Sequence, residues 1–337
     1  MTHALRSASE YAWRHPWIPI ALFALGYGIR FADVDEFRAI TANPYVVNVQ
    51  PQYQFLYASP LTFFLGSYYQ HHAIDPGTSF LIVAALGLVL LAAAAQRWVA
   101  AEFDRPDRPV AWLVLCSSPL LFVVLFWVGK SDVYLLAFFL LLAASASPVT
   151  RAILAALVVL CHGELGAAVL VGYALLTPLD WRSVVAGLGV GESALFIYTH
   201  RLLSAVPLSR SAYAFSHLSD LASVFWAHPI LHLVAALGPF WLYVAARRQI
   251  AIAETLVLAA AFALSVLSYD YTRVFVIVSL PLILVVTKDA AMAMRRDSGL
   301  GIGSYVLGAH ALWPLVFLQV QLAGPKLFWA RGEILLK

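Results

Sequence analysis

The chain has little charge and little cysteine, and these shortages exclude several classes of protein. Only 12% of its 337 residues are charged, 62% are hydrophobic, and the mean hydropathy is +0.83. No soluble domain of this size has that composition. Its two cysteines, Cys116 and Cys161, both lie inside apolar runs, so we predict neither a disulfide framework nor a zinc site. The net charge of +3 comes from basic residues in short links, which argues against nucleic-acid binding.

Long apolar runs almost free of charge take the place of these features. A helix needs roughly 20 apolar residues to cross a bilayer, so we predict an all-α, polytopic transmembrane bundle of about 10–11 helices. The composition is uniform, which indicates a single integral membrane domain, residues 1–337. The first run lacks a small-residue cleavage site, so we expect it to be retained. The predicted helices cover residues 16–31, 79–98, 110–128, 133–146, 152–161, 165–176, 183–199, 221–246, 252–268, 273–287 and 303–322.

Basic residues predict the orientation of these helices. With the N-terminus inside and residues 32–78 in an outer loop, the inner loops hold about twice as many Lys and Arg as the outer links. Residues 55–69 carry no charge and contain Ser59-Pro60, so we predict an interfacial helix there. A membrane-spanning segment 55–69 is the alternative, and it would place Arg97, Arg105 and Arg108 outside.

Two of the predicted helices, 152–161 and 165–176, are too short to span a bilayer and meet at His162-Gly163-Glu164. Broken helices are tolerated in membranes mainly where they line a polar cavity. The i, i+2 spacing would put His162 and Glu164 on different faces of a continuous helix, but a break at Gly163 would let both face one cavity. The alternative is a pair of interfacial polar residues. We favour a functional site, because a carboxylate in lipid needs a partner.

Further ionisable residues gather in the links predicted to lie outside. Ionisable groups at membrane depth are costly, so they default to a functional hypothesis. Each also has a structural interpretation as a helix cap or as one half of a local ion pair. The outer loop 200–220 is either an amphipathic lid or an interfacial anchor. Gly129-Lys130-Ser131 is not a nucleotide-binding P-loop, because Val124 stands where that motif needs glycine. The remaining candidates are Asp33, Asp35, Glu36, Lys130, Asp132, Tyr269, Asp270 and Arg273.

Several of these pieces, in this order, resemble the GT-C superfamily of membrane glycosyltransferases. The likeness rests on the acidic residues of the first outer loop, on Tyr57-Ala58-Ser59-Pro60-Leu61, on Gly129-Lys130-Ser131-Asp132, on the break at His162-Gly163-Glu164, and on Arg273-Val274-Phe275 before Pro281. Lys130 stands where many members have Gln, and His-Gly-Glu stands where they have a Lys-Pro-like break. We therefore expect contacts to the donor that differ from the family pattern at these two places.

The resemblance implies inverting transfer of a sugar from a polyprenyl-phosphate donor to a lipid, glycan or protein acceptor. The implied base is Asp35 or Glu36, and then Asp33. Lys130 and Arg273 are expected to stabilise the leaving phosphate. Asp132, His162, Glu164, Tyr269 and Asp270 are the expected substrate contacts. No metal ligand is implied, and a divalent cation is allowed without being required. The implied location is a bacterial inner membrane, with the active site on its outer face.

Three other readings of the residues stay open. An O-antigen-type polysaccharide polymerase would also have about ten or more helices, and product length separates it from a single-sugar transferase. A transporter or flippase would place polar groups near the midplane and show a repeat of helices, whereas here the polar groups gather towards one side. A membrane scaffold would bind a partner through its outer loops without converging acids and bases.

Overall fold

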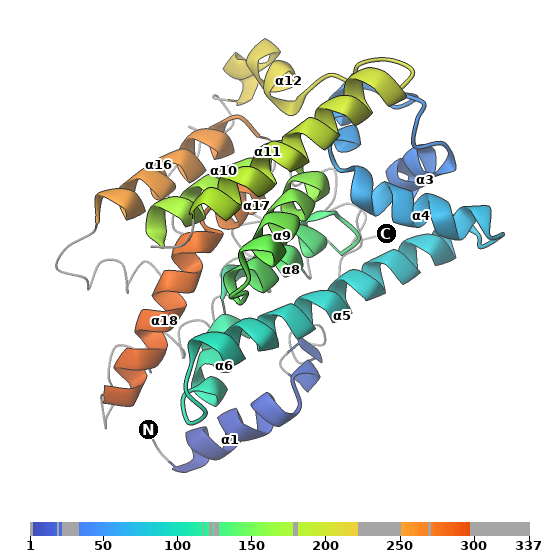
Figure 1. Ribbon diagram of the computed structural model, residues 1–337. Helices are drawn as coiled ribbons and strands as arrows, with labels where there is room; N and C mark the ends of the chain where they lie inside the picture. The colour runs from blue at the N-terminus through green and yellow to red at the C-terminus, as the bar shows by residue number, and fades with distance from the viewer. Residues whose placement is uncertain are drawn as a thin grey trace. The chain divides into compact units, whose positions relative to one another are not determined.

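The computed structural model describes residues 3–18, 20–21, 34–116, 118–120, 124, 128–177, 181–221, 251–268 and 271–296. These residues form helices and their connections, with no strand among them (Figure 1), which confirms the all-α class. Within them one helix, α5 (Pro76–Glu102), is long and apolar enough to cross a membrane. The polytopic bundle therefore stays a prediction. The chain divides into two compact units, one of residues 1–28, 103–123 and 214–337 and one of residues 29–102 and 124–213.

The first unit contains α1 (His3–Arg14), α6 (Arg108–Cys116), α16 (Ile252–Val266), α17 (Tyr271–Val278) and α18 (Leu280–Arg296). Helix α1 was not predicted, and it packs on α6 with Trp13 and Trp112 edge to face at 6.1 Å. The predicted helix 273–287 is interrupted, because α17 ends at Val278 and α18 begins at Leu280. Pro281 explains the interruption, since proline has no N–H and clashes with the preceding turn. The predicted helices 221–246 and 303–322 and most of 16–31 lie outside the described residues.

The second unit holds most of the candidate site residues. The predicted helices 79–98, 133–146, 152–161, 165–176 and 183–199 are all found in it, with shifted ends. Its elements are α3 (Val34–Ala42), the 3₁₀ helix η1 (Pro51–Ala58), α4 (Pro60–His71), α5, α8 (Asp132–Ala143), α9 (Pro148–Cys161), α10 (Gly163–Leu176), α11 (Trp181–Ile197), the π-helical turn η2 (Tyr198–Leu202) and the first turn of α12 (Arg210–Ser216). Helix α8 packs between α5 and α9, and α9 packs against α10 and α11 (Figure 1).

The outer segment predicted as one interfacial helix over residues 55–69 is two short elements. Helix η1 ends at Ala58 and α4 begins at Pro60, with Ser59 between them at φ −126° and ψ 54°. Proline is tolerated in the first turn of a helix, where its missing N–H needs no partner. Helix α4 has 12 residues, well short of the roughly 20 that a perpendicular span requires.

Glycines bring α9 and α11 into close contact. A Cβ atom on Gly187 would lie 2.3 Å from the Ala152 carbonyl oxygen, and one on Gly191 would lie 2.8 Å from the Val159 Cβ. Small residues at i and i+4 let helix backbones approach closely, as in membrane helix pairs. This packing fixes the C-terminal end of α11 beside the break between α9 and α10, and so positions the site.

Candidate functional site

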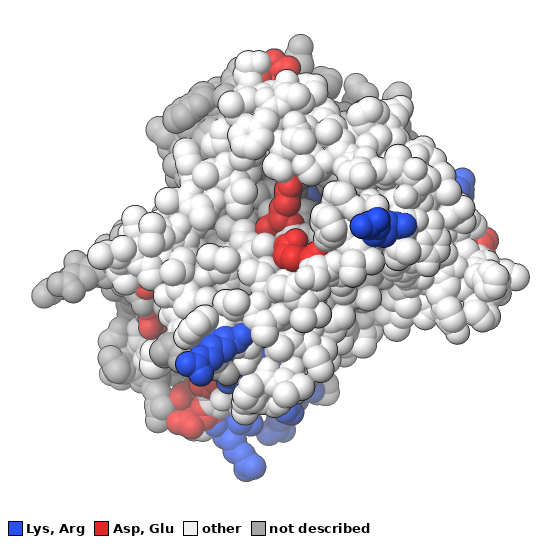
Figure 2. Space-filling model, turned by 45° about the horizontal axis from the view of Figure 1, so that its top comes forward, with Lys and Arg blue, Asp and Glu red and all other residues white. Residues whose placement is uncertain are grey.

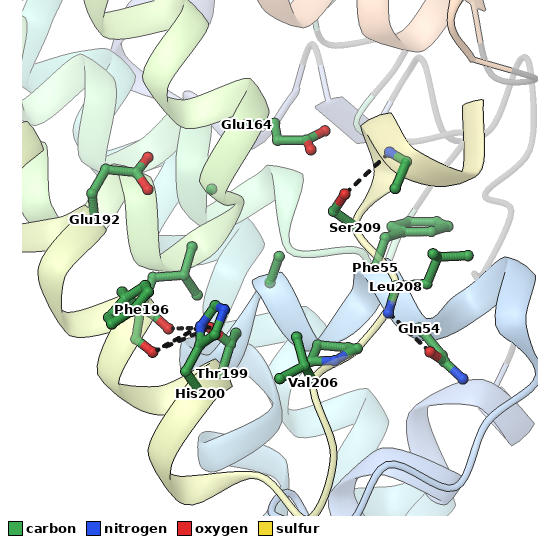
Figure 3. Close-up of a pocket in the computed structure, with 15 residues that line it drawn as sticks. Gln54, Phe55, Glu164, Glu192, Phe196, Thr199, His200, Val206, Leu208 and Ser209 are labelled. Carbon is green, nitrogen blue, oxygen red and sulfur yellow. Dashed lines mark hydrogen bonds between the residues drawn. The ribbon is translucent and has the colours of Figure 1, made fainter. Parts of the chain in front are cut away.

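A cavity of about 720 Å³ opens in the second unit (Figure 3). Its walls come from η1, the N-terminus of α10, the C-terminal end of α11, η2 and the segment 206–212. This volume is typical of small-ligand sites. Most of the lining is apolar, with Phe55 and Phe196 as its aromatic members. The polar lining residues are Gln54, Glu164, Glu192, Thr199, His200 and Ser209.

Glu164 reaches this cavity because the chain breaks just before it. Helix α9 ends at Cys161, His162 adopts an extended backbone, and α10 begins at Gly163. A Cβ atom on Gly163 would lie 2.6 Å from the Leu195 Cδ2, so only glycine fits here without a shift. Glu164 lies in the first turn of α10, where the helix dipole favours a negative charge. The predicted break is therefore present.

His162 does not share the cavity with Glu164, contrary to the expectation that Gly163 turns both side chains to one side. The His162 side chain is buried and is not among the residues that line the cavity. His162 occupies the N-cap position of α10 with φ −165° and ψ 99°, and its side chain makes no capping hydrogen bond to the helix. Because the backbone of His162 is extended and that of Glu164 is helical, the two side chains point in different directions.

Glu192 is a site residue that the sequence interpretation missed. It lies within α11 and lines the same cavity as Glu164, close enough for the two negative charges to act on each other. Figure 3 shows both carboxylates at one end of the cavity, with Gln54, Val206 and His200 at the other. The available signal was a single carboxylate inside the apolar run 183–199, since such a group is a functional candidate by default.

The segment 203–213 forms one wall of the cavity and is tied down by hydrogen bonds. The Leu208 N–H donates to Gln54 Oε1 at 2.9 Å. The Ser211 N–H and hydroxyl both donate to Glu164 Oε1, at 3.2 and 2.8 Å. The Ser204 N–H donates to the Tyr45 carbonyl at 2.9 Å. The lid and the interfacial anchor both stay predictions for residues 200–220, and the structure shows that part of this segment lines the cavity.

A second polar cluster surrounds an ion pair between Glu36 and Lys130. Glu36 Oε2 and Lys130 Nζ are 3.1 Å apart, and the side chains are only 11% and 14% exposed. Lys130 follows Gly129, whose φ of +97° is the left-handed region that favours glycine. A Cβ atom there would also lie 2.2 Å from the Phe80 ring. The pair borders a small cavity of about 20 Å³, which is room for one water molecule.

The acidic residues predicted as the catalytic base fall into different environments. Asp35 is 88% exposed and pairs with Arg38 at 3.7 Å, so it points to the surface and not into either cavity. Glu36 is the member that meets Lys130. Asp33 lies outside the described residues. The structure thus joins Glu36 to Lys130 across 94 residues of sequence and leaves Asp35 apart from both.

Helix η1 separates the two cavities. Gln54, Phe55 and Ala58 line the larger one, and Leu56 lines the smaller one. At the end of η1, the Ser131 hydroxyl donates to Ser59 Oγ at 3.3 Å. The two polar clusters are therefore neighbours that share one wall.

Of the remaining predicted contacts, the structure describes Asp132 and Arg273, and neither lines the larger cavity. Asp132 is buried in the first turn of α8. Arg273 is buried in α17 of the first unit. Tyr269 and Asp270 lie outside the described residues. The described part of the chain contains no group of three or more His, Cys, Asp or Glu side chains that could hold a metal ion.

The charges on the face drawn in Figure 2 are few, and acidic side chains lie together near its middle. Comparison of the chain with protein-family models, curated proteins and solved structures finds no match. The geometry of the site and the sequence pattern therefore carry the functional argument.

Proposed function

We propose that this chain is a membrane glycosyltransferase that moves a sugar from a polyprenyl-phosphate donor to a hydroxyl of a lipid, glycan or protein acceptor. The observation that carries the proposal is the mostly apolar cavity with two carboxylates at one end and a few polar side chains elsewhere in its lining. Carboxylates accept hydrogen bonds from sugar hydroxyls, and aromatic side chains such as Phe55 and Phe196 offer flat apolar surface to the C–H faces of a sugar. A lipid-linked sugar combines both requirements.

A membrane location is supported by the outward faces of the second unit. Leu81 and Val89 on α5, Ile153 on α9, and Val185 and Val190 on α11 are each more than half exposed. Several helices thus present large aliphatic side chains outward. Extended exposed apolar surface indicates contact with a membrane or another protein, and helix α5 is long enough to cross a bilayer. Both features fit a protein whose substrate is anchored in lipid.

The proposed reaction needs one base and one group that binds the sugar. The acceptor oxygen forms a bond to the anomeric carbon while its proton passes to a carboxylate. The bond from that carbon to the phosphate oxygen breaks, and the electron pair leaves with the lipid phosphate, so the configuration inverts. The structure favours Glu192 as the base, because Glu164 is engaged by Ser211 and Glu36 by Lys130. Lys130, the predicted phosphate contact, borders the smaller cavity beyond η1 and pairs there with Glu36, so the proposed step does not use it.

The test is sugar transfer from a panel of radiolabelled polyprenyl-phosphate sugars in proteoliposomes. We expect the wild type to transfer one sugar, and Glu192→Gln to lose about a hundredfold or more in rate. Ser193→Ala is the matched control, since Ser193 neighbours Glu192 in sequence and does not line the cavity. Absence of transfer by the wild type from every donor would contradict the proposal. Products carrying many sugars would replace it with a polymerase.

A further inference from the structure

The two carboxylates of the larger cavity have the same chemistry but different hydrogen-bonding partners. Glu164 Oε1 accepts two hydrogen bonds from one residue, Ser211, 47 positions along the chain. Hydrogen bonds to an ionised carboxylate are stronger than those between neutral groups. Glu164 also lies in the first turn of α10, where the helix dipole stabilises an anion. The two hydrogen bonds hold the Glu164 carboxylate in one orientation.

Ser211 is itself fixed by a chain of hydrogen bonds. Its hydroxyl proton is given to Glu164, so the contact of 3.2 Å between the hydroxyls of Ser209 and Ser211 requires Ser209 to be the donor. Ser209 Oγ in turn accepts from the Ala212 N–H at 3.1 Å. The network therefore runs from the Ala212 N–H through Ser209 and Ser211 to Glu164. Hydrogen bonds connected in this way polarise and strengthen one another.

Glu192 lies outside this network. It lines the same cavity from within α11, and among the described residues it makes no hydrogen bond or ion pair. Its carboxylate lies at the same end of the cavity as Glu164 (Figure 3). We propose that Ser211 is a positioning residue, which holds Glu164 as the sugar-binding carboxylate and leaves proton transfer to Glu192. This inference rests on the proposed function and assigns separate roles within its site.

The separate roles predict separate kinetic defects. In Ser211→Ala the backbone N–H still meets Glu164, but the hydroxyl bond and its network are lost. We expect KM for the donor to rise about tenfold with a smaller change in kcat. Ser211→Thr keeps the hydroxyl and should restore KM to near the wild-type value. Glu192→Gln should show the opposite pattern, with kcat reduced and KM little changed.

The experiment measures kcat and KM for these three variants, with Ser209→Ala and the control Ser193→Ala, in the same proteoliposomes. Ser209→Ala removes the hydroxyl that donates to Ser211, so it should raise KM by less than Ser211→Ala does. It also provides a second test if Ser211→Ala does not fold. An active wild type with unchanged KM in Ser211→Ala and Ser209→Ala would overturn this inference alone. A Ser211→Thr variant as impaired as Ser211→Ala would also overturn it. An inactive wild type would remove the proposed function and this inference together.

Discussion

At the scale of single residues, the structure separates side chains that the sequence places next to each other. Asp35 and Glu36 are neighbours on α3, and successive residues of a helix point about 100° apart. Asp35 therefore faces the surface beside Arg38, whereas Glu36 points inward to Lys130. An inward carboxylate needs a partner, because a charge removed from water without one is costly. The two acids thus have different energetic roles.

The first prediction concerns this ion pair. Lys130→Met leaves Glu36 largely buried without its cation, so we expect a loss of about 2–4 kcal/mol in the free energy of unfolding. Adding Glu36→Gln should recover part of that loss, since the uncompensated charge is removed. The control Arg38→Met breaks the exposed pair with Asp35 and should cost less than about 1 kcal/mol. Denaturant unfolding in detergent micelles measures all three; equal losses for Lys130→Met and Arg38→Met would contradict the burial argument.

At the scale of elements, close helix packing positions the site. Gly187 and Gly191 let α11 approach α9, and the end of α11 then forms one wall of the larger cavity. Gly189 lies between these two glycines on the same helix, but a Cβ atom there would meet nothing within 4 Å. Three glycines at neighbouring positions therefore have two different structural roles.

The second prediction compares Gly187→Ala with Gly189→Ala. At Gly187 the new methyl group meets the Ala152 carbonyl, so α11 must shift and stability should fall by about 1–3 kcal/mol. At Gly189 the methyl group has open space, and alanine's better helix propensity should leave stability unchanged or raise it by up to about 1 kcal/mol. Thermal unfolding in detergent gives the unfolding temperature of each variant, which should be lower for Gly187→Ala than for Gly189→Ala. Equal unfolding temperatures for the two would show that the helices are not in tight contact.

The third prediction uses the N-terminus of α5. The Thr78 N–H donates to Asp75 Oδ1 at 3.0 Å. Hydrogen bonds from the Thr78 side chain and backbone hold the pKa of Asp75 below its ordinary 3.8. A carboxyl whose pKa is lowered by folding contributes stability that is present above its unfolded pKa and is lost as the pH falls through its folded pKa. Asp75→Asn should therefore reduce the pH dependence of stability below about pH 4, as measured by unfolding in an acid series. An unchanged acid dependence in Asp75→Asn would argue against this contribution.

At the scale of the whole molecule, a membrane location stays a prediction, which the exposed apolar surface and the proposed substrate both fit. The outer faces of α5, α9 and α11 carry large aliphatic side chains, while charge on the face drawn in Figure 2 is sparse. The native cysteines Cys116 and Cys161 are both buried. The molecule therefore offers a low background for testing its position in a bilayer with introduced cysteines.

The fourth prediction is a pattern of cysteine labelling in intact cells. Asp75→Cys should react with a membrane-impermeant maleimide added outside, because residues 32–78 are predicted to lie there. Arg105→Cys should react only after permeabilisation. Val190→Cys, on the exposed face of α11, should react with a membrane-soluble reagent and resist the impermeant one. Reversed labelling of Asp75→Cys and Arg105→Cys would establish the topology in which residues 55–69 cross the membrane, and impermeant labelling of all three would contradict a membrane location.

Composition and spacing were sufficient for the helical class and for the break between α9 and α10. Both are local properties: apolar runs favour helices, and a glycine between two polar residues interrupts them. The same reasoning did not predict the end of α17 before Pro281 or the role of Glu192. Pro281 was available as a signal. A single carboxylate in an apolar run indicates that the residue needs polar partners. It does not indicate which residues of the chain those partners are.

Only the tertiary structure decided which polar groups meet. Glu36 and Lys130 are 94 residues apart, and Glu164 and Ser211 are 47 apart, so no local pattern connects either pair. Asp35 and Glu36 look equivalent along the chain and differ once α3 is packed, because the packing of a helix determines which of its faces is buried. The sequence alone therefore determined the helical class, and it predicts that the helices lie in a membrane with acids and bases towards one side. The packing of those helices determines which carboxylates share a cavity, because side-chain direction depends on contacts between distant elements.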